Sequence, residues 1–255
     1  MQEGIFQLNG RRALITGSTQ GIGLALAYGL ARSGATIVLN GRDPQRVAAA
    51  AEKMRADGFS AEGAAFDVTQ QNSVIEAVDR IERESGAIDI LINNAGIQRR
   101  APLEDFPVEN WEAILANNVS SVFYVSQAVA RHMIPRRRGK IINICSVQSQ
   151  LGRPTIAPYT ASKGAVANLT KGMCADWAKY GIQANGLAPG YFATEMNKAL
   201  VENQEFSDWL CKRTPAGRWG QVEELNGAAI FLASDASSFV NGQILYVDGG
   251  MTACV

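Results

Sequence analysis

Short runs of β-branched and aliphatic residues alternate with amphipathic helical patterns along the whole chain. Strand-like runs are expected at 12–16, 35–40, 63–68, 88–93, 140–145, 183–187 and 242–247. Helical patterns lie between them, at 21–33, 43–56, 71–84, 111–133, 158–180 and 222–233. Successive parallel strands need a long crossover connection, usually a helix. The alternation therefore predicts an α/β fold, a parallel sheet covered by helices on both faces.

The length and composition fit one such domain. The chain has 255 residues, of which 47% are apolar and 19% are charged, as in an ordinary globular protein. No repeat, low-complexity tract or linker interrupts the pattern, although 194–213 reads as an inserted helical hairpin. We therefore expect residues 1–255 to form a single domain.

Charge and hydropathy argue against several classes of partner. The 24 basic and 24 acidic residues cancel, so nothing favours nucleic acid or an anionic membrane. No apolar run approaches the ~20 residues that a membrane span needs. The N-terminal residues 1–4 lack the pattern of a signal peptide. These observations predict a cytoplasmic protein.

Cysteine and histidine usage is sparse. Cys145, Cys174, Cys211 and Cys254 are widely spaced and form no Cys-x-x-Cys, which predicts free thiols. The single histidine, His132, lies late in a helical pattern, where a structural role is expected. One histidine excludes a metal site of the H-E-x-x-H type, and we expect no metal.

A glycine-rich turn connects the first expected strand to the first helix. Such a turn lets backbone N–H groups and the positive helix end meet a phosphate. The spacing, GxxxGxG, differs from the commoner GxGxxG, and alone it is weak evidence. Its place after the first strand predicts nucleotide binding. The residues expected at the cofactor are Gly17, Ser18, Thr19, Gln20, Gly21, Ile22 and Gly23.

The end of the second strand indicates which nicotinamide cofactor fits. An acid there would bind the ribose hydroxyls, whereas an arginine would accept a 2′-phosphate. Gly41 stands where the acid is expected and Arg42 follows, which predicts NADP over NAD. Alternatively, Arg42 is solvated and Asp43 only caps a helix. After the third strand, Asp67 and Val68 could hold the adenine, or Asp67 could simply form a turn.

Three residues near the fifth strand suggest proton transfer. Ser146 ends that strand, and Tyr159 and Lys163 lie one helical turn apart behind Pro158. A phenol titrates near pH ~10, and a nearby ammonium lowers that pKa. The three could therefore transfer a proton at neutral pH. Tyr-x-x-x-Lys alone also fits an interfacial tyrosine and a solvated lysine.

Taken together, these motifs resemble the short-chain dehydrogenase/reductase family. The resemblance covers essentially the whole chain. It rests on 16–23, 93–96, Asn118 in 118–123, Ser146 thirteen residues before Tyr159, Lys163, 189–190 and 247–250. Further runs resemble the members that act on sugar acids. These are 93–100, 142–146, 148–153, 189–192, 194–196 and 209–215.

The resemblance implies one Rossmann-like domain, a doubly wound, seven-stranded parallel sheet, and a hydride-transfer enzyme. Tyr159 would be the acid in reduction and the base in oxidation. Lys163 would lower the pKa of Tyr159 and hold the nicotinamide ribose. Ser146 would bind the reacting oxygen, and Asn118 would hold a proton path, with its neighbour Asn117 as the alternative. Further cofactor contacts would be Asn94, Ala95, Gly96, Pro189, Gly190, Phe192 and Thr194.

A sugar-acid substrate needs a partner for its carboxylate, and arginine suits a bidentate contact. The candidates are Arg99, Arg100 and Arg153, while Gln98, Gln148 and Glu195 could bind hydroxyls. The expected substrate site also includes Ser146, Tyr159 and Tyr191. Each of the arginine, glutamine and glutamate side chains could equally be solvated or part of an interface. Rival readings are a reductase of another carbonyl, such as a 3-oxoacyl thioester or a different sugar acid, and a nucleotide-binding sensor without turnover.

The segment 194–219 carries apolar residues spaced as an amphipathic helical hairpin. It would form a lid that shields the reaction from water, or it could be packed surface. The family also implies a homotetramer. One dimer contact would use 111–133 and 158–180, and the other the last strand with 251–255. The same apolar faces could instead pack on the sheet.

Overall fold

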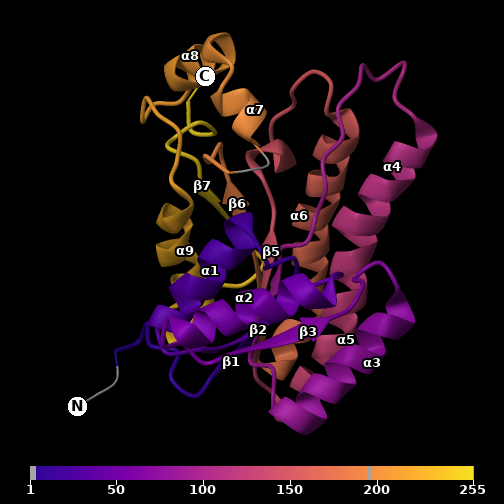
Figure 1. The fold of residues 1–255 in the computed structure, drawn as a ribbon, viewed down its shortest axis with the longest axis vertical. Coiled ribbons are helices and arrows are strands. Elements are labelled where there is room, and N and C mark those ends of the chain that lie inside the picture. The colour runs from indigo at the N-terminus through magenta and orange to yellow at the C-terminus, as the bar shows by residue number, and fades with distance from the viewer. Residues whose placement is uncertain (1–3, 195–196, 255) are drawn as a thin grey trace.

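The computed structural model describes residues 4–194 and 197–254, which form one seven-stranded sheet (Figure 1). Every strand pair is parallel, and the order is β3-β2-β1-β4-β5-β6-β7. The strands are β1 (Arg12–Ile15), β2 (Thr36–Gly41), β3 (Ala61–Ala65), β4 (Ile90–Asn93), β5 (Gly139–Ile144), β6 (Ile182–Pro189) and β7 (Ile244–Val247). The predicted parallel sheet is confirmed. The order reverses between β1 and β4, and ligands of such sheets bind beyond the strand ends at this point.

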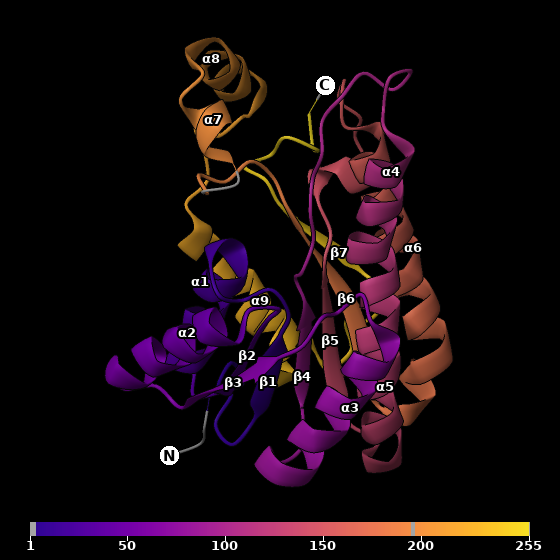
Figure 2. The same ribbon diagram turned by 45° about the vertical axis from the view of Figure 1, so that its right-hand side comes forward.

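Helices cover both faces of the sheet (Figures 1 and 2). One face carries α1 (Gly21–Arg32), α2 (Pro44–Ala56) and α9 (Asn226–Ala233). The other carries α3 (Gln71–Arg80), α5 (Ser121–Arg136) and α6 (Ala157–Trp177).

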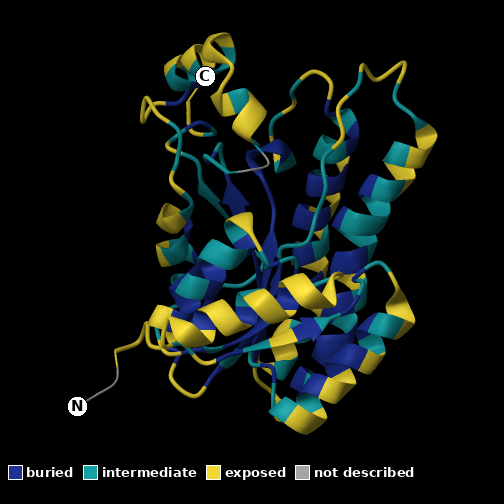
Figure 3. Cartoon of the chain, viewed as in Figure 1, coloured by how far each residue is buried: buried dark blue, intermediate teal, exposed yellow. Residues whose placement is uncertain are grey.

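Neighbouring strand residues alternate between the two cores. Leu14 and Leu91 pack into one core, whereas Ile15 and Ile92 pack into the other. A parallel sheet buried on both faces needs such continuous apolar strands, and Figure 3 shows the central strands buried and the outer side of α2 exposed. Within the described ranges, no helix is long and apolar enough to cross a membrane.

The long helix expected at 111–133 is longer and is interrupted. It consists of α4 (Val108–Leu115), a π-helical turn (Ala116–Ser120) and α5. A π-helical turn inserts one extra residue, and such turns are frequent at functional sites. This one contains the buried Asn118.

Other boundaries differ from the expected ones for local reasons. The third strand lies at β3 rather than 63–68, because the Asp67 side chain accepts hydrogen bonds from the Thr69 N–H and hydroxyl and starts a turn. The predicted cap of α2 is confirmed, since Asp43 accepts from the N–H groups of Gln45 and Arg46. The helix expected at 71–84 ends in a second π-helical turn (Ile81–Ser85). Short 3-10 turns cover Val147–Ser149, Ala178–Tyr180, Val222–Leu225 and Asp235–Ser237.

The insertion after β6 contains two helices, α7 (Lys198–Val201) and α8 (Gln204–Arg213). They stand at the end of the molecule where the C-terminal segment lies (Figures 1 and 2). Arg213 donates a hydrogen bond to the carbonyl of Cys254, which ties α8 to that segment. The helical hairpin predicted here is therefore present.

Candidate active site

Ser146 lies at the carboxyl end of β5, where the chain enters a 3-10 turn. Its hydroxyl oxygen accepts a hydrogen bond from the Gln148 N–H at 3.1 Å. Because a backbone donor occupies one lone pair, the hydroxyl hydrogen can be donated elsewhere. The side chain is only 8% exposed. Ser146 is thus held beside α6, where its hydroxyl forms a hydrogen bond with Tyr159.

Tyr159 and Lys163 lie one turn apart on α6, as predicted. Lys163 is 5% exposed, and its Nζ donates to the Ile144 carbonyl at 2.7 Å. The same Nζ lies 5.7 Å from the centroid of the Tyr159 ring. Burial lowers the pKa of Lys163 to about 8, since the charged form loses water.

The pKa of Tyr159 differs from its expected direction. Burial raises the pKa of Tyr159, and the hydrogen bond with Ser146 acts in the opposite direction but is weaker. The lowering expected from Lys163 is not what this structure shows. The reason is that the cost of burying the charged phenolate outweighs the interactions that favour it. Tyr159 is therefore protonated at neutral pH, which is the state that a proton donor requires.

Asn118 joins the loop after β4 to α6. Its Oδ1 accepts from the Ile97 N–H at 2.8 Å, and its Nδ2 donates to the Ile97 carbonyl and the Ser162 hydroxyl at 3.0 Å each. The Asn117 side chain instead donates to Ala113 within its own helix. Of these two asparagines, Asn118 is the one placed beside the candidate catalytic residues.

The glycine turn after β1 has the shape of an anion site. A Cβ on Gly17 would lie 3.0 Å from the Ala95 Cα, and one on Gly23 would lie 2.6 Å from the Gly17 oxygen. At Gly21, where φ is +58°, a Cβ would meet nothing within 4 Å. In the described residues no side chain caps α1 at Gln20, so its first N–H groups are left as donors. These features fit a dinucleotide pyrophosphate.

Two residues that were predicted to contact the cofactor instead hold this turn in place. Ser18 is fully buried; its N–H donates to the Asn40 carbonyl, and its hydroxyl donates to the Ile15 carbonyl. Asn94 donates to the carbonyls of Thr16 and Gly17. The Ser18 N–H, the Ser18 hydroxyl and the Asn94 side-chain amide are thus already bonded within the chain, so the cofactor contacts predicted for these two residues would use other atoms.

Asn40, which the sequence reasoning did not single out, completes the support of the turn. Its Oδ1 accepts from the Gly17 N–H at 3.2 Å, and its Nδ2 donates to the carbonyls of Ala64 and Phe66 at 3.1 Å. The available signal was an amide inside an otherwise apolar strand, because a buried polar side chain needs partners.

The end of β2 is basic and carries no carboxylate at position 41. Arg42 is exposed and makes no hydrogen bond or ion pair with any residue that the structure describes. A Cβ on Gly41 would lie 3.1 Å from Val47. Arg46, which the sequence reasoning also missed, donates to the Gln20 side chain beside the glycine turn at 2.6 Å. Two guanidinium groups thus stand where a 2′-phosphate would be.

The remaining cofactor candidates lie along the same edge of the sheet. Gly96 follows β4, and a Cβ there would lie 3.2 Å from the Asn118 Oδ1. Pro189 ends β6, and a Cβ on Gly190 would lie 2.7 Å from the Asp248 Cα. Phe192 is buried against Gly220. The other candidates lie after β1, in the first turn of α1, after β3, after β4 and after β6. They are Thr19, Ile22, Asp67, Val68, Ala95 and Thr194.

Two of the three candidate arginines, Arg100 and Arg153, lie within range of each other's charge. Burial lowers the pKa of Arg100, the charge of Arg153 lowers it further, and Tyr191 acts in the opposite direction. The Arg153 guanidinium lies 5.1 Å from the centroid of the Phe206 ring in α8. Arg99 is exposed and donates to the Gln98 carbonyl beside it. Arg100 and Arg153 are therefore the two candidate arginines that interact electrostatically.

Gln148 is a buried polar residue with an unpaired side-chain atom. It is 6% exposed, and its Oε1 has no hydrogen-bond partner among the residues described. An unpaired buried amide is costly, so a donor from a ligand would satisfy it. Gln98 and Glu195 were also predicted to bind substrate hydroxyls. Of these two, Glu195 lies outside the described residues.

The segment over the site is held by aromatic contacts. Phe206 lies 5.9 Å from Tyr191, 5.3 Å from Trp209 and 6.3 Å from Trp219 between ring centroids. The Trp219 indole N–H donates to the Ser207 hydroxyl at 2.9 Å. These contacts join α8 to the end of β6.

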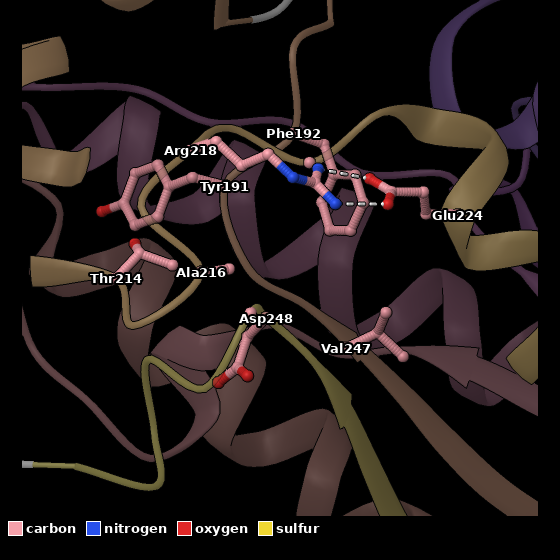
Figure 4. A pocket seen from close by; sticks show the side chains of 10 residues that line it. Tyr191, Phe192, Thr214, Ala216, Arg218, Glu224, Val247 and Asp248 are labelled. Carbon is pink, nitrogen blue, oxygen red and sulfur yellow. Dashed lines mark hydrogen bonds and ion pairs between the residues drawn. The ribbon is translucent and has the colours of Figure 1, made fainter.

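A cavity of about 100 Å³ lies beneath this segment (Figure 4). Arg218 spans its wall to Glu224 in a two-pronged ion pair, and Tyr191 lies on the other side. Ser146, Tyr159 and Lys163 do not line it. The cavity therefore borders the candidate site without forming it.

Comparisons with known proteins agree with this geometry. The family model described as enoyl-(acyl carrier protein) reductase matches residues 17–252. A gluconate 5-dehydrogenase of Gluconobacter oxydans is 66% identical over 248 residues, 97% of each chain. A 5-keto-D-gluconate 5-reductase of Escherichia coli is 56% identical over 251 residues, 98% of this chain and 99% of that one.

A solved structure is similarly close. The crystal structure of a gluconate 5-dehydrogenase from Burkholderia cenocepacia, in complex with NADP and tartrate, has a TM-score of 0.97. It is 66% identical and covers 98% of both chains. With its sheet order, its glycine turn and its serine, tyrosine and lysine in place, the chain belongs to the short-chain dehydrogenase/reductase family.

Proposed function

We propose that the protein is an NADP-dependent oxidoreductase that interconverts D-gluconate and 5-dehydro-D-gluconate. The observation that carries this is the 66% and 56% identity, over nearly the whole chain, to two enzymes named for that conversion. The sequence runs that resemble sugar-acid enzymes follow β4, β5 and β6, where a substrate of an open α/β sheet binds.

The candidate residues can perform both directions of the reaction. The nicotinamide, when bound, exchanges a hydride with the substrate carbon. In reduction, Tyr159 donates its phenolic proton to the carbonyl oxygen, while the Ser146 hydroxyl stabilises the negative charge developing there. In oxidation, the phenolate of Tyr159 removes the proton of the alcohol. Lys163 lies near Tyr159 and Ser146, and it can donate hydrogen bonds to the ribose hydroxyls of the cofactor. Because burial raises the pKa of Tyr159, oxidation should gain rate as the pH rises.

The preference for NADP is supported by charge at the end of β2. Arg42 is uncommitted among the described residues, and Arg46 stands beside the glycine turn. A guanidinium binds phosphate in a bidentate manner. The relative from Burkholderia cenocepacia was crystallised with NADP.

The substrate carboxylate would bind between Arg100 and Arg153. Burial and, to a smaller extent, the charge of Arg153 lower the pKa of Arg100, and an anion bound between the two cations would offset both effects. Gln148 would accept a hydrogen bond from a substrate hydroxyl. The same relative was crystallised with tartrate, a small hydroxy acid. A long apolar acyl thioester would leave the two arginines unpaired.

The deciding experiment follows NADPH absorbance with 5-dehydro-D-gluconate, 2-dehydro-D-gluconate, fructose and an acetoacetyl thioester, each also with NADH. We expect fast turnover of 5-dehydro-D-gluconate with NADPH. Preferred turnover of another carbonyl would keep the mechanism and overturn the substrate. If NADPH bound but no carbonyl reacted, we would test further substrates first and favour a sensor role second.

We also propose a homotetramer that works in the cytoplasm. Val108, Trp111 and Phe123 expose apolar surface on α4 and α5, and all four residues of β7 are only partly buried at the sheet edge. Contiguous exposed apolar surface is typical of interfaces. All four cysteines lie in the described part and are free thiols, as in a reducing compartment. Light scattering should give four times the chain mass of 27.3 kDa.

A further inference from the structure

We infer that Ser149 is a positioning residue, whose hydroxyl sets the spacing between the catalytic serine and the catalytic helix. This inference rests on the proposed function, because it takes Ser146, Tyr159 and Lys163 as the reacting set. Ser149 itself touches neither reactant in that scheme. It acts through the backbone atoms of two residues that do.

The Ser149 hydroxyl bonds to both sides of the site. Its Oγ donates to the main-chain carbonyl of Lys163 at 2.9 Å. The same oxygen accepts from the backbone N–H of Ser146 at 3.3 Å. One side-chain atom thus connects the start of the 3-10 turn to the middle of α6, fourteen residues further along the chain.

A second hydrogen bond also joins α6 to the end of β5. The Nζ of Lys163 donates to the Ile144 carbonyl at 2.7 Å, just before Ser146 in the chain. Lys163 is therefore held at both ends, by its side chain to the last residue of β5 and by its carbonyl to Ser149. Tyr159 lies one turn earlier on the same helix. Fixing Lys163 against the 3-10 turn consequently fixes where the tyrosine stands relative to Ser146.

The orientation of Ser146 depends on the same turn. Its Oγ accepts from the Gln148 N–H at 3.1 Å while its own N–H donates to Ser149. This reciprocal pair is a capping box, which satisfies two backbone donors at once. Without the Ser149 hydroxyl, the Ser146 N–H loses its acceptor and the turn loses its bond to α6. The Ser146 hydroxyl would then no longer be held toward the reacting oxygen of the substrate, which Tyr159 also contacts.

The test compares Ser149→Ala with Ser149→Thr, which keeps the hydroxyl. A misplacement of about 1 Å can cost ~10²-fold in rate, so we expect Ser149→Ala to lower kcat about 10- to 100-fold with KM for NADPH unchanged. We expect Ser149→Thr to recover most of that loss. Ser234→Ala is the matched control, since it removes another serine hydroxyl that donates to a backbone carbonyl, remote from the site. It should lower Tm by a similar amount without lowering kcat.

Two further readouts separate positioning from simple destabilisation. Because the hydrogen bond from Ser146 lowers the pKa of Tyr159, Ser149→Ala should move the pH profile of gluconate oxidation to higher pH. In a Ser146→Ala background, the same change should cost little further rate, since the two would act through one interaction. An unchanged kcat in Ser149→Ala, or full additivity with Ser146→Ala, would overturn the inference. Absence of turnover by the unmodified enzyme would instead count against the proposed function.

Discussion

Arg42 is the residue on which the choice between the two nicotinamide dinucleotides depends. It follows Gly41 at the end of β2, is exposed, and has no partner among the residues described. A guanidinium in this position has charge available for a 2′-phosphate, and the absence of an acid at 41 removes the partner that NAD would use.

Replacing Arg42 with alanine should therefore affect one cofactor selectively. A charge-assisted hydrogen bond is worth about 1.5–3 kcal/mol, so KM for NADPH should rise roughly 10- to 100-fold while KM for NADH changes little. Initial rates with both cofactors measure this. Arg83→Ala, at an exposed arginine paired with Glu84, is the control and should change neither KM. An equal loss with NADPH and NADH would show that Arg42 does not bind the 2′-phosphate.

The same residue scale shows what could be predicted for the site. The glycine turn and the trio Ser146, Tyr159 and Lys163 are local in sequence, so spacing alone indicated them. The roles of Asn40 and Ser149 could not be predicted, because each depends on a hydrogen bond across elements that are distant in the chain. The raised pKa of Tyr159 was also missed, since burial is decided by packing around the residue and not by its neighbours in sequence.

At the scale of elements, α8, which belongs to the segment 194–219, contacts the candidate substrate residue Arg153. Phe206 packs against Tyr191 and Trp219, and Arg153 lies over its ring. A cation over an aromatic face gains about 0.5–2 kcal/mol. Carboxylate binding by Arg153 and the position of α8 should therefore be coupled.

Phe206→Ala tests that coupling. We expect KM for the sugar acid to rise roughly 5- to 30-fold, in line with a loss of about 1–2 kcal/mol, with KM for NADPH nearly constant. Steady-state kinetics with each substrate varied in turn would measure it. The control is Phe59→Ala, which removes the edge-on pair with Tyr28 away from the site. If the two variants had the same kinetics as the unmodified enzyme, α8 would be packed surface and not a lid.

At the scale of the whole molecule, a buried lysine makes stability depend on pH. Lys140 in β5 is 6% exposed, and its Nζ donates to the Ser237 hydroxyl at 3.1 Å. Burial lowers the pKa of Lys140 to about 8, with Asp235 and Arg11 acting in opposite directions nearby. The pKa of lysine in an unfolded chain is about 10.4. Between those values the unfolded chain binds more protons, so stability from this group rises with pH.

Lys140→Met should remove that dependence. The free energy of unfolding of the variant, relative to the unmodified protein, should be most favourable at pH 7 and fall as the pH rises from 8 to 10. Urea unfolding at each pH measures the difference, and the contribution of Lys163 cancels because both proteins contain it. Lys171→Met, at an exposed lysine on α6, should give a constant difference. A pH-independent difference for Lys140→Met would refute the assignment.

The sequence by itself determined the class of fold, because apolar runs that alternate with helical patterns along the whole chain are typical of a parallel sheet buried between two layers of helices. It also determined the chemistry of the local motifs, where the reacting residues are one helical turn or one strand end apart. The tertiary structure decided the rest. It placed Arg100 beside Arg153, bound Lys163 to Ile144 and inserted the π-helical turn at Asn118. The physical reason is that these contacts join segments far apart in the chain, whose meeting is set by packing and burial.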